Sequence, residues 1–207
     1  MTPSVVETPE DGVLMRRTMP IDEYLAWSPE GGLTEWVNGE GVHYVSATKY
    51  HQGVIVFLIQ LLGLFVSKRK LGKVCAAPYA MRGTPGGNTR EPDVFFVGKD
   101  RLHLMRDNYF DGSADLVIEV VSDDSVTRDR VEKFDEYQEA GVKEYWIIDP
   151  RPGRNRALFF VLEDGQFTPV RVNSANVYRS TVLSGLELNV AWLWEESPDI
   201  AHILGQI

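Results

Sequence analysis

One acidic residue stands inside an apolar run of this sequence. Leu116–Val121 is apolar except for Glu119, a pattern typical of a buried central strand. A buried carboxylate is costly unless it is paired with a cation or bound to a metal. Upstream, Asp93 opens a second apolar run, Val94–Val97. Two carboxylates on neighbouring strands would form a hard-oxygen site for Mg²⁺ or Mn²⁺, which predicts metal-assisted hydrolysis, with phosphodiesters as the expected substrate.

A lysine in the segment after Glu119 could reach the same site. Residues 126–140 have helical periodicity, and Lys133 projects from within the apolar face that includes Phe134 and Tyr137. Asp129 lies four residues before Lys133 and could pair with its ammonium or orient it. Lys133 would then polarise an attacking water or stabilise charge on a phosphate in the transition state.

Each of these residues also has a structural interpretation. Glu119 could form a buried salt bridge with an arginine or a lysine. Lys133 could lie at the edge of its helix and only cover apolar surface. Asp93 could be a turn or cap residue, because it follows a proline. By themselves, Glu40 is more typical of an exposed hairpin residue and His51 of a helix-edge residue.

The elements that must position these side chains follow from local patterns. Helices are predicted over residues 19–27, 48–70 and 126–140. Strands are predicted over residues 33–37, 40–46, 73–82, 93–97, 115–121, 143–148, 158–162 and 167–172. The Asn38-Gly39 turn joins two of these strands in a hairpin, and Glu163-Asp164-Gly165 joins another pair. The strand–helix–strand order in the middle predicts an α/β (α+β) fold: a mixed sheet flanked by helices, with extra β-hairpins.

Length and composition place the chain among ordinary globular proteins. Its 207 residues predict one domain over residues 19–195, a flexible N-terminal arm over 1–18 and a C-terminal tail over 196–207. The lone Cys75 excludes a disulfide framework and a cysteine zinc cluster, which favours a cytoplasmic setting. We see no signal peptide in residues 1–20. The apolar stretch of residues 53–66 is too short to cross a bilayer, so a core helix and no membrane contact are predicted.

The net charge and the apolar residues near the C-terminus suggest which partners the protein could bind, nucleic acid or a second copy of itself. The net charge of −9 disfavours a general nucleic-acid coat protein. It allows a nuclease, because acidic metal ligands add negative charge and bound cations reverse the local field. Trp192, Trp194 and Ile203 could form a homodimer interface, or they could pack on the core of their own chain.

Several of these residues belong to a set of motifs that occur in one order along the chain. The motifs are Glu40, Pro92-Asp93, Ile118-Glu119-Val120-Val121-Ser122, Asp129-x-x-x-Lys133-x-x-x-Tyr137 and the segment of residues 141–150. Together they resemble the Uma-two family of endonucleases, which belongs to the PD-(D/E)XK, restriction-endonuclease-like superfamily. The similarity covers about residues 19–195, and the block of residues 116–150 is its specific part.

The resemblance implies a fold and a set of site residues. The fold would be a restriction-endonuclease-like mixed sheet with flanking helices. Asp93 and Glu119 would be the acidic ligands of Mg²⁺ or Mn²⁺, and the backbone carbonyl of Val120 could complete the ligand set. Glu40 would match the upstream acidic position of the family, and His51 would match the histidine early in its long helix.

The resemblance also implies a function, with one departure. The superfamily motif has a lysine two residues after the acid, where this chain has Val121, and the family's lysine lies on the following helix, where Lys133 stands. The implied function is a metal-dependent endonuclease that hydrolyses phosphodiester bonds, with DNA as the expected nucleic acid. Val121 and the acidic charge also motivate a catalytically silent module that binds nucleic acid or a protein. A third hypothesis is a metal-dependent hydrolase of another phosphoester.

Overall fold

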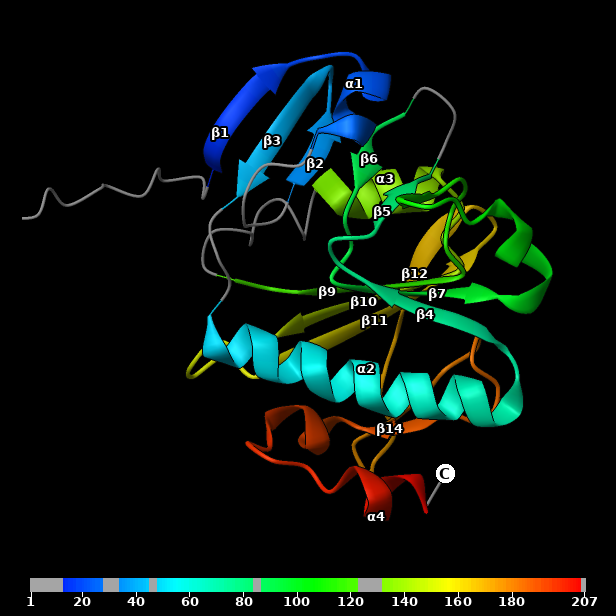
Figure 1. The fold of residues 1–207 in the computed structure, drawn as a ribbon. Helices are drawn as coiled ribbons and strands as arrows, with labels where there is room; N and C mark the ends of the chain where they lie inside the picture. Colours follow the sequence, from blue (N-terminus) through cyan, green and yellow to red (C-terminus); the bar gives the residue numbers. More distant parts are fainter. Residues whose placement is uncertain (1–12, 28–33, 45–47, 84–86, 123–131, 206–207) are drawn as a thin grey trace, which may run out of the picture.

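The computed structural model describes residues 13–27, 34–44, 48–83, 87–122 and 132–205. These residues form stacked layers, which Figure 1 shows from the side. An upper sheet lies over a central sheet, helix α2 (Lys49–Arg69) runs beneath the central sheet, and a small C-terminal layer lies beneath α2. The layers confirm the predicted class, a mixed α/β fold with helices on the faces of a sheet.

The central sheet carries two of the predicted site positions. It has six strands in the order β12-β11-β10-β9-β7-β4. Its strands are β4 (Gly72–Ala76), β7 (Val94–Gly98), β9 (Leu116–Val120), β10 (Glu144–Asp149), β11 (Arg156–Glu163) and β12 (Gln166–Val170). Strands β9 and β10 are parallel and the other neighbours are antiparallel. The parallel pair fits the predicted crossover, because parallel strands need a long connection.

The upper sheet is built from the first hairpin and several short strands. Its six strands follow the order β1-β3-β2-β6-β5-β8. They are β1 (Val13–Thr18), β2 (Thr34–Val37), β3 (Glu40–Tyr44), β5 (Ala80–Arg82), β6 (Thr89–Arg90) and β8 (Tyr109–Phe110). The turn between β2 and β3 has Asn38 and Gly39 at positive φ, as the hairpin signal predicts.

The remaining elements cover the two sheets. They are α1 (Ile21–Ala26), η1 (Lys99–Leu104), α3 (Lys133–Glu139), β13 (Val177–Arg179), β14 (Glu187–Asn189), η3 (Val190–Trp194) and α4 (Ile200–Leu204). Helix α3 lies on the face of the central sheet that is opposite α2, alongside the upper sheet (Figure 1). Strands β13 and β14, with η3 and α4, make the C-terminal layer.

Alternation along β9 assigns its side chains to two cores. Leu116, Ile118 and Val120 pack in the core that includes α2, whereas Val117 and Val121 pack in the core that includes residues of α3 and the upper sheet. Side chains alternate between the faces of a strand. Glu119 therefore faces α3 and the upper sheet.

Helix α2 is the main apolar cover of the central sheet. It begins after Thr48, whose side chain accepts a hydrogen bond from the backbone N–H of His51, and ends at Lys70 in the left-handed conformation. Leu58, Leu61 and Phe65 are fully buried. In the described part of the chain, α2 is also the one helix with the length and apolar composition of a membrane span, and half of that span is buried within the protein. Core helices of soluble proteins share these properties.

The C-terminal layer packs on this core and is anchored by a buried carboxylate. Ile203 is buried in the α2 core, and Trp192 and Trp194 are partly buried against it. These apolar residues therefore pack within their own chain, the alternative to a homodimer interface. The fully buried Glu144 accepts hydrogen bonds from the Trp146 indole N–H, the Tyr178, Ser180 and Thr181 hydroxyls and the backbone N–H groups of Thr181 and Val182.

The structure corrects several predicted boundaries. Residues 13–18, predicted as part of a flexible arm, form β1 and pair with β3. The predicted strand over residues 73–82 is two strands in different sheets, because the chain turns at residues 77–79. Helix α4 lies inside the predicted tail, residues 196–207. Helix α3 begins at Lys133 in the described residues, and the part of the predicted helix over 126–131 lies outside them.

Candidate functional site

Asp93 and Glu119 come together at one edge of the pairing between β7 and β9. Val94 pairs with Ile118 at the end of the antiparallel β7–β9 ladder, so Asp93 and Glu119 are the residues that come next to this pair on the two segments. The backbone N–H of Val120, the neighbour of Glu119, donates a hydrogen bond to Asp93 Oδ2. Both side chains are buried, with residue exposures of 7% for Asp93 and 2% for Glu119. The structure thus brings together the two carboxylates that the strand patterns singled out.

The Glu119 carboxylate is bound by two side chains from α3. The Lys133 ammonium lies 2.9 Å from Oε1, and the Tyr137 hydroxyl donates a 2.6 Å hydrogen bond to the same oxygen. Lys133 and Tyr137 lie four residues apart, so they project from the same side of the helix. The Lys133 side chain is only 1% exposed, which excludes the alternative that it covers an apolar edge with its ammonium in water.

Asp93 is held by the neighbouring strand and by α2. The backbone N–H of Val120 donates a 2.7 Å hydrogen bond to Asp93 Oδ2, and His51 Nε2 lies 3.3 Å from the same oxygen. The carboxylate therefore does not cap its own turn, the alternative that its position after a proline suggested. All its described side-chain contacts use Oδ2, which leaves Oδ1 available to a ligand.

Two further charged residues complete the cluster, and sequence reasoning missed both. Glu35 on β2 is fully buried, with Oε1 3.2 Å from the Lys133 ammonium. Its Oε2 accepts a 2.7 Å hydrogen bond from Nη1 of Arg90 on β6. The signal for Glu35 was available in the first hairpin, because its register places this carboxylate opposite the apolar Val42.

For three other predicted site residues, the predicted role is not seen among the described contacts. Glu40 lies opposite Val37 in the hairpin, with 41% of its side chain exposed and an ion pair of 3.9 Å to Arg16. No described contact joins Glu40 to Asp93 or Glu119, so its role in the site stays a prediction. Asp129 lies outside the described residues. Val120 contributes its N–H to Asp93, and the role of its carbonyl stays a prediction.

The charges of the cluster determine the protonation of its hydroxyl and guanidinium groups. Burial, together with the negative charge of Glu119, raises the pKa of the Tyr137 hydroxyl well above its usual value. Tyr137 therefore remains a hydrogen-bond donor at neutral pH. Burial alone would lower the pKa of Arg90. The carboxylates of Glu35 and Glu136 have a larger opposite effect, so the pKa of Arg90 lies above its usual value. The Arg90 guanidinium is therefore permanently charged inside the protein.

The donor set of Asp93 and Glu119 fits a hard divalent cation only with help from other ligands. Within the described ranges, no three His, Cys, Asp or Glu side chains are arranged to hold a metal ion by themselves. Mg²⁺ is commonly bound by one or two carboxylates and keeps several waters, with substrate phosphate completing its shell. Two carboxylates on one face, with Oδ1 of Asp93 not hydrogen-bonded to a described residue, meet that smaller requirement.

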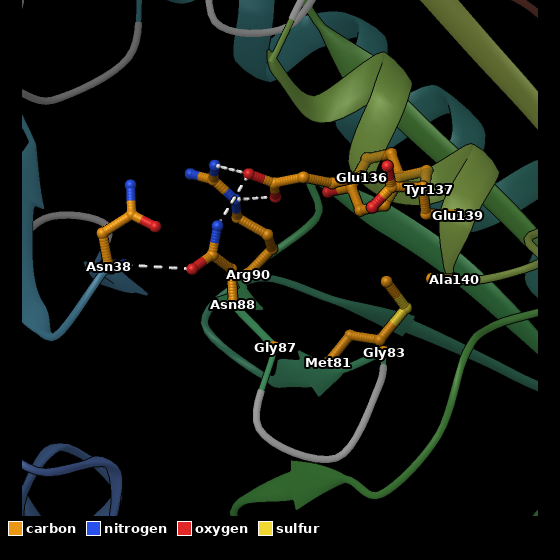
Figure 2. Close-up of a pocket in the computed structure, with 10 residues that line it drawn as sticks. All are labelled: Asn38, Met81, Gly83, Gly87, Asn88, Arg90, Glu136, Tyr137, Glu139 and Ala140. Atoms are coloured by element: carbon orange, nitrogen blue, oxygen red, sulfur yellow. Dashed lines mark hydrogen bonds and ion pairs between the residues drawn. The ribbon is translucent and has the colours of Figure 1, made fainter.

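A cavity of about 460 Å³ opens beside this cluster. Figure 2 shows that Arg90 and Glu136 face one another on its wall, with Tyr137 next to Glu136 on α3. Tyr137 therefore lines the cavity and also binds Glu119. The other lining residues are Asn38, Met81, Gly83, Gly87, Asn88, Glu139 and Ala140.

Comparison with known proteins identifies the family. The chain belongs to the Uma2 family, described as "Putative restriction endonuclease", whose sequence model matches residues 21–191. This match confirms the family that the motif order predicted. A search of curated proteins finds no match.

A solved structure shows the same fold. The chain is similar to the crystal structure of a "putative nuclease belonging to DUF820" from Anabaena variabilis ATCC 29413, with a TM-score of 0.71 and 15% sequence identity. The alignment covers 86% of this chain and 98% of that one. At this identity the likeness shows the fold alone, and it confirms the predicted restriction-endonuclease-like fold. The chain is therefore a member of a restriction endonuclease family, and it has the restriction-endonuclease-like fold.

Proposed function

We propose that the protein is a Mg²⁺- or Mn²⁺-dependent endonuclease that hydrolyses phosphodiester bonds in DNA. The observation that carries the proposal is the buried ammonium of Lys133 beside Glu119, with the Asp93 carboxylate bound to the backbone N–H of Val120, the next residue after Glu119. An acidic pair with an adjacent lysine supplies both cation ligands and a positive charge for a phosphate. Membership of a restriction endonuclease family supports phosphodiesters as the substrate.

Five side chains of the site have roles in this mechanism. Asp93 and Glu119 would hold the cation, which when bound lowers the pKa of a water and neutralises phosphate charge. Lys133 Nζ stabilises negative charge as it develops on the phosphate, or orients the attacking water. Tyr137 holds Glu119 through its 2.6 Å hydrogen bond, and His51 holds Asp93.

The setting that we propose is the cytoplasm, with DNA as the partner and no membrane contact. The single Cys75 is buried and unbonded, which suits a reducing compartment. The apolar residues that suggested a homodimer pack within the chain, so the proposal needs no second copy.

A second candidate is a catalytically silent module that binds nucleic acid or a protein. Two observations favour it: Val121 stands where the superfamily motif has its lysine, and the described residues contain no three-side-chain metal cluster. In this case the buried Lys133–Glu119 pair is a structural salt bridge.

The test is cleavage of linear, circular and single-stranded DNA, and of RNA, with Mg²⁺ or Mn²⁺. Glu119→Ala is compared with Glu163→Ala, which changes an exposed residue of the β11–β12 hairpin. We expect metal-dependent cutting of DNA that Glu119→Ala loses and Glu163→Ala keeps. Circular dichroism checks that both variants are folded.

Metal binding is measured separately by calorimetry on the same three proteins. We expect Mn²⁺ binding by the wild type and by Glu163→Ala, and loss of that binding in Glu119→Ala. Unchanged Mn²⁺ affinity in Glu119→Ala would remove Glu119 from the ligand set. Absence of cutting by the wild type, or equal cutting by Glu119→Ala, would favour the silent module.

A further inference from the structure

The structure places one arginine between the candidate site and the cavity. The Arg90 side chain is 3% exposed and binds carboxylates on both sides. Its Nη1 donates to Glu35 at 2.7 Å, while Nε and Nη2 donate to the two oxygens of Glu136, each at 2.7 Å. Figure 2 shows the paired contact with Glu136 on the cavity wall. Three charge-assisted hydrogen bonds from a planar group leave the guanidinium one orientation.

Glu136 is itself held in place by a second side chain that lines the cavity. Asn88 donates a 2.8 Å hydrogen bond to Glu136 Oε1 and accepts one of 3.0 Å from the backbone N–H of Asn38. The contacts thus tie the turn after β2, strand β6 and helix α3 together. A fixed Glu136 gives Arg90 a fixed position.

The charges of these residues alternate along one line of contacts. The order is Glu136, Arg90, Glu35, Lys133 and Glu119, so each cation lies between two carboxylates. Lys133 is shared, at 3.2 Å from Glu35 and 2.9 Å from Glu119. Arg90 binds Glu35 through Oε2, which leaves Oε1 directed at the lysine. Without Arg90, the Glu35 carboxylate would lose this constraint and turn, and the Lys133 ammonium would change its position relative to Glu119.

We infer, on the basis of the proposed nuclease function, that Arg90 is a positioning residue for Lys133. By bridging Glu136 and Glu35, its guanidinium holds Glu35 in the orientation that directs the Lys133 ammonium to Glu119. Arg90 acts through Glu35, because its Nε, Nη1 and Nη2 atoms are engaged by Glu136 and Glu35. A lysine could not replace it, because one ammonium on a flexible stem cannot bind two carboxylates in the planar geometry of a guanidinium.

The neighbouring cavity makes this role testable by chemical rescue. It is lined by Arg90 and Glu136, and its volume of about 460 Å³ admits a small alkylguanidinium. In Arg90→Ala, ethylguanidinium can enter the space of the deleted side chain and bind both carboxylates. Ethylammonium carries the same charge without the planar fork, so it is the matched control.

The first readout is cleavage kinetics. We expect Arg90→Ala to lower kcat at least tenfold with less than a twofold change in KM, because the affected lysine acts in the transition state. Ethylguanidinium should restore kcat at least fivefold, and ethylammonium should not. Arg90→Lys should resemble Arg90→Ala. Arg101→Ala is the control arginine, because Arg101 is partly exposed and pairs with Asp115.

The second readout needs neither metal nor activity. In metal-free protein at fixed pH, the ¹⁵Nζ signal of Lys133 reports the contacts of its buried ammonium. We expect this signal to shift in Arg90→Ala, to return with ethylguanidinium and to stay unchanged in Arg101→Ala. Glu136→Gln serves if Arg90→Ala does not fold, because Glu136 is partly exposed and its change weakens only the outer contact.

The outcomes separate the two proposals. A wild type that does not cleave DNA overturns the nuclease proposal, and the Lys133 signal then decides the positioning role alone. An unchanged Lys133 signal in both Arg90→Ala and Glu136→Gln overturns the positioning role even if the wild type is an active nuclease. Equal rescue by ethylammonium would also overturn it, because charge without the planar fork would suffice.

Discussion

Glu91 allows a direct test of how burial controls an ionisable group in this fold. It is 5% exposed and lies between Arg90 and the Pro92-Asp93 motif. Burial raises the pKa of its carboxyl from 4.5 to about 7, although donors from Thr34 and Tyr24 work in the opposite direction. The Thr34 backbone N–H and hydroxyl donate at 3.1 and 2.9 Å, and the Tyr24 hydroxyl at 3.4 Å.

The direction and size of the effect on stability follow from these two pKa values. Below pH 4.5 the carboxyl is protonated in both states. Between pH 4.5 and 7 the folded protein keeps a proton that the unfolded chain has lost, so the free energy of unfolding falls as pH rises. The difference in pKa corresponds to about 3 kcal/mol in total. Most of it, about 2.5 kcal/mol, is lost between pH 5 and pH 8.

The assay is urea unfolding of the wild type and of Glu91→Gln at pH 5, 6, 7 and 8. Glutamine does not titrate, so other ionisable groups cancel in the difference between the two proteins. We expect the wild type to lose about 2.5 kcal/mol relative to Glu91→Gln over this range. Glu163→Gln, at an exposed hairpin position, is the matched control substitution. A constant difference between the wild type and Glu91→Gln would mean that Glu91 is already ionised in the folded protein at pH 5.

Three further predictions concern other contacts. Glu144→Ala should lower the free energy of unfolding, measured by urea denaturation, by about 3–5 kcal/mol, because buried donors lose their acceptor. A loss below about 1 kcal/mol would show that Glu144 does not anchor the C-terminal layer. Tyr137→Phe deletes a 2.6 Å hydrogen bond to the buried Glu119, so DNA cleavage should slow about tenfold and the free energy of unfolding should fall by about 1–3 kcal/mol. An unaltered rate would show that Glu119 needs no such support. Gly72→Ala would place Cβ 2.0 Å from the carbonyl oxygen of Val97, so Tm should fall clearly, whereas Gly165→Ser at an open turn should cost less.

Local patterns predicted much of the fold and the centre of the site. The apolar runs around Glu119 and after Asp93 are two paired strands of the central sheet, and the long apolar helix covers one of its faces. Lys133 projects from the packed side of its helix, as its position among apolar residues indicated. These features were predictable because side-chain periodicity depends on residues that are close together in the sequence.

Contacts between distant segments were not predictable in the same way. Glu40 was expected in the site, yet Glu35 on the preceding strand of the same hairpin contacts Lys133. Arg90 gave no local signal, since its two partners lie 55 and 46 residues away. The turn at residues 77–79 sends β4 and β5 to different sheets, although the segment has one continuous strand pattern.

The sequence by itself determined that Glu119 and Lys133 are buried, because an acid inside an apolar strand and a lysine on an apolar helix face have few other positions. It also determined the family, through the order of its motifs. Only the tertiary structure decided which charges meet. The energy of a buried ion pair depends on distances of about 3 Å between side chains, and strands and helices from remote parts of the chain must first pack before those distances exist.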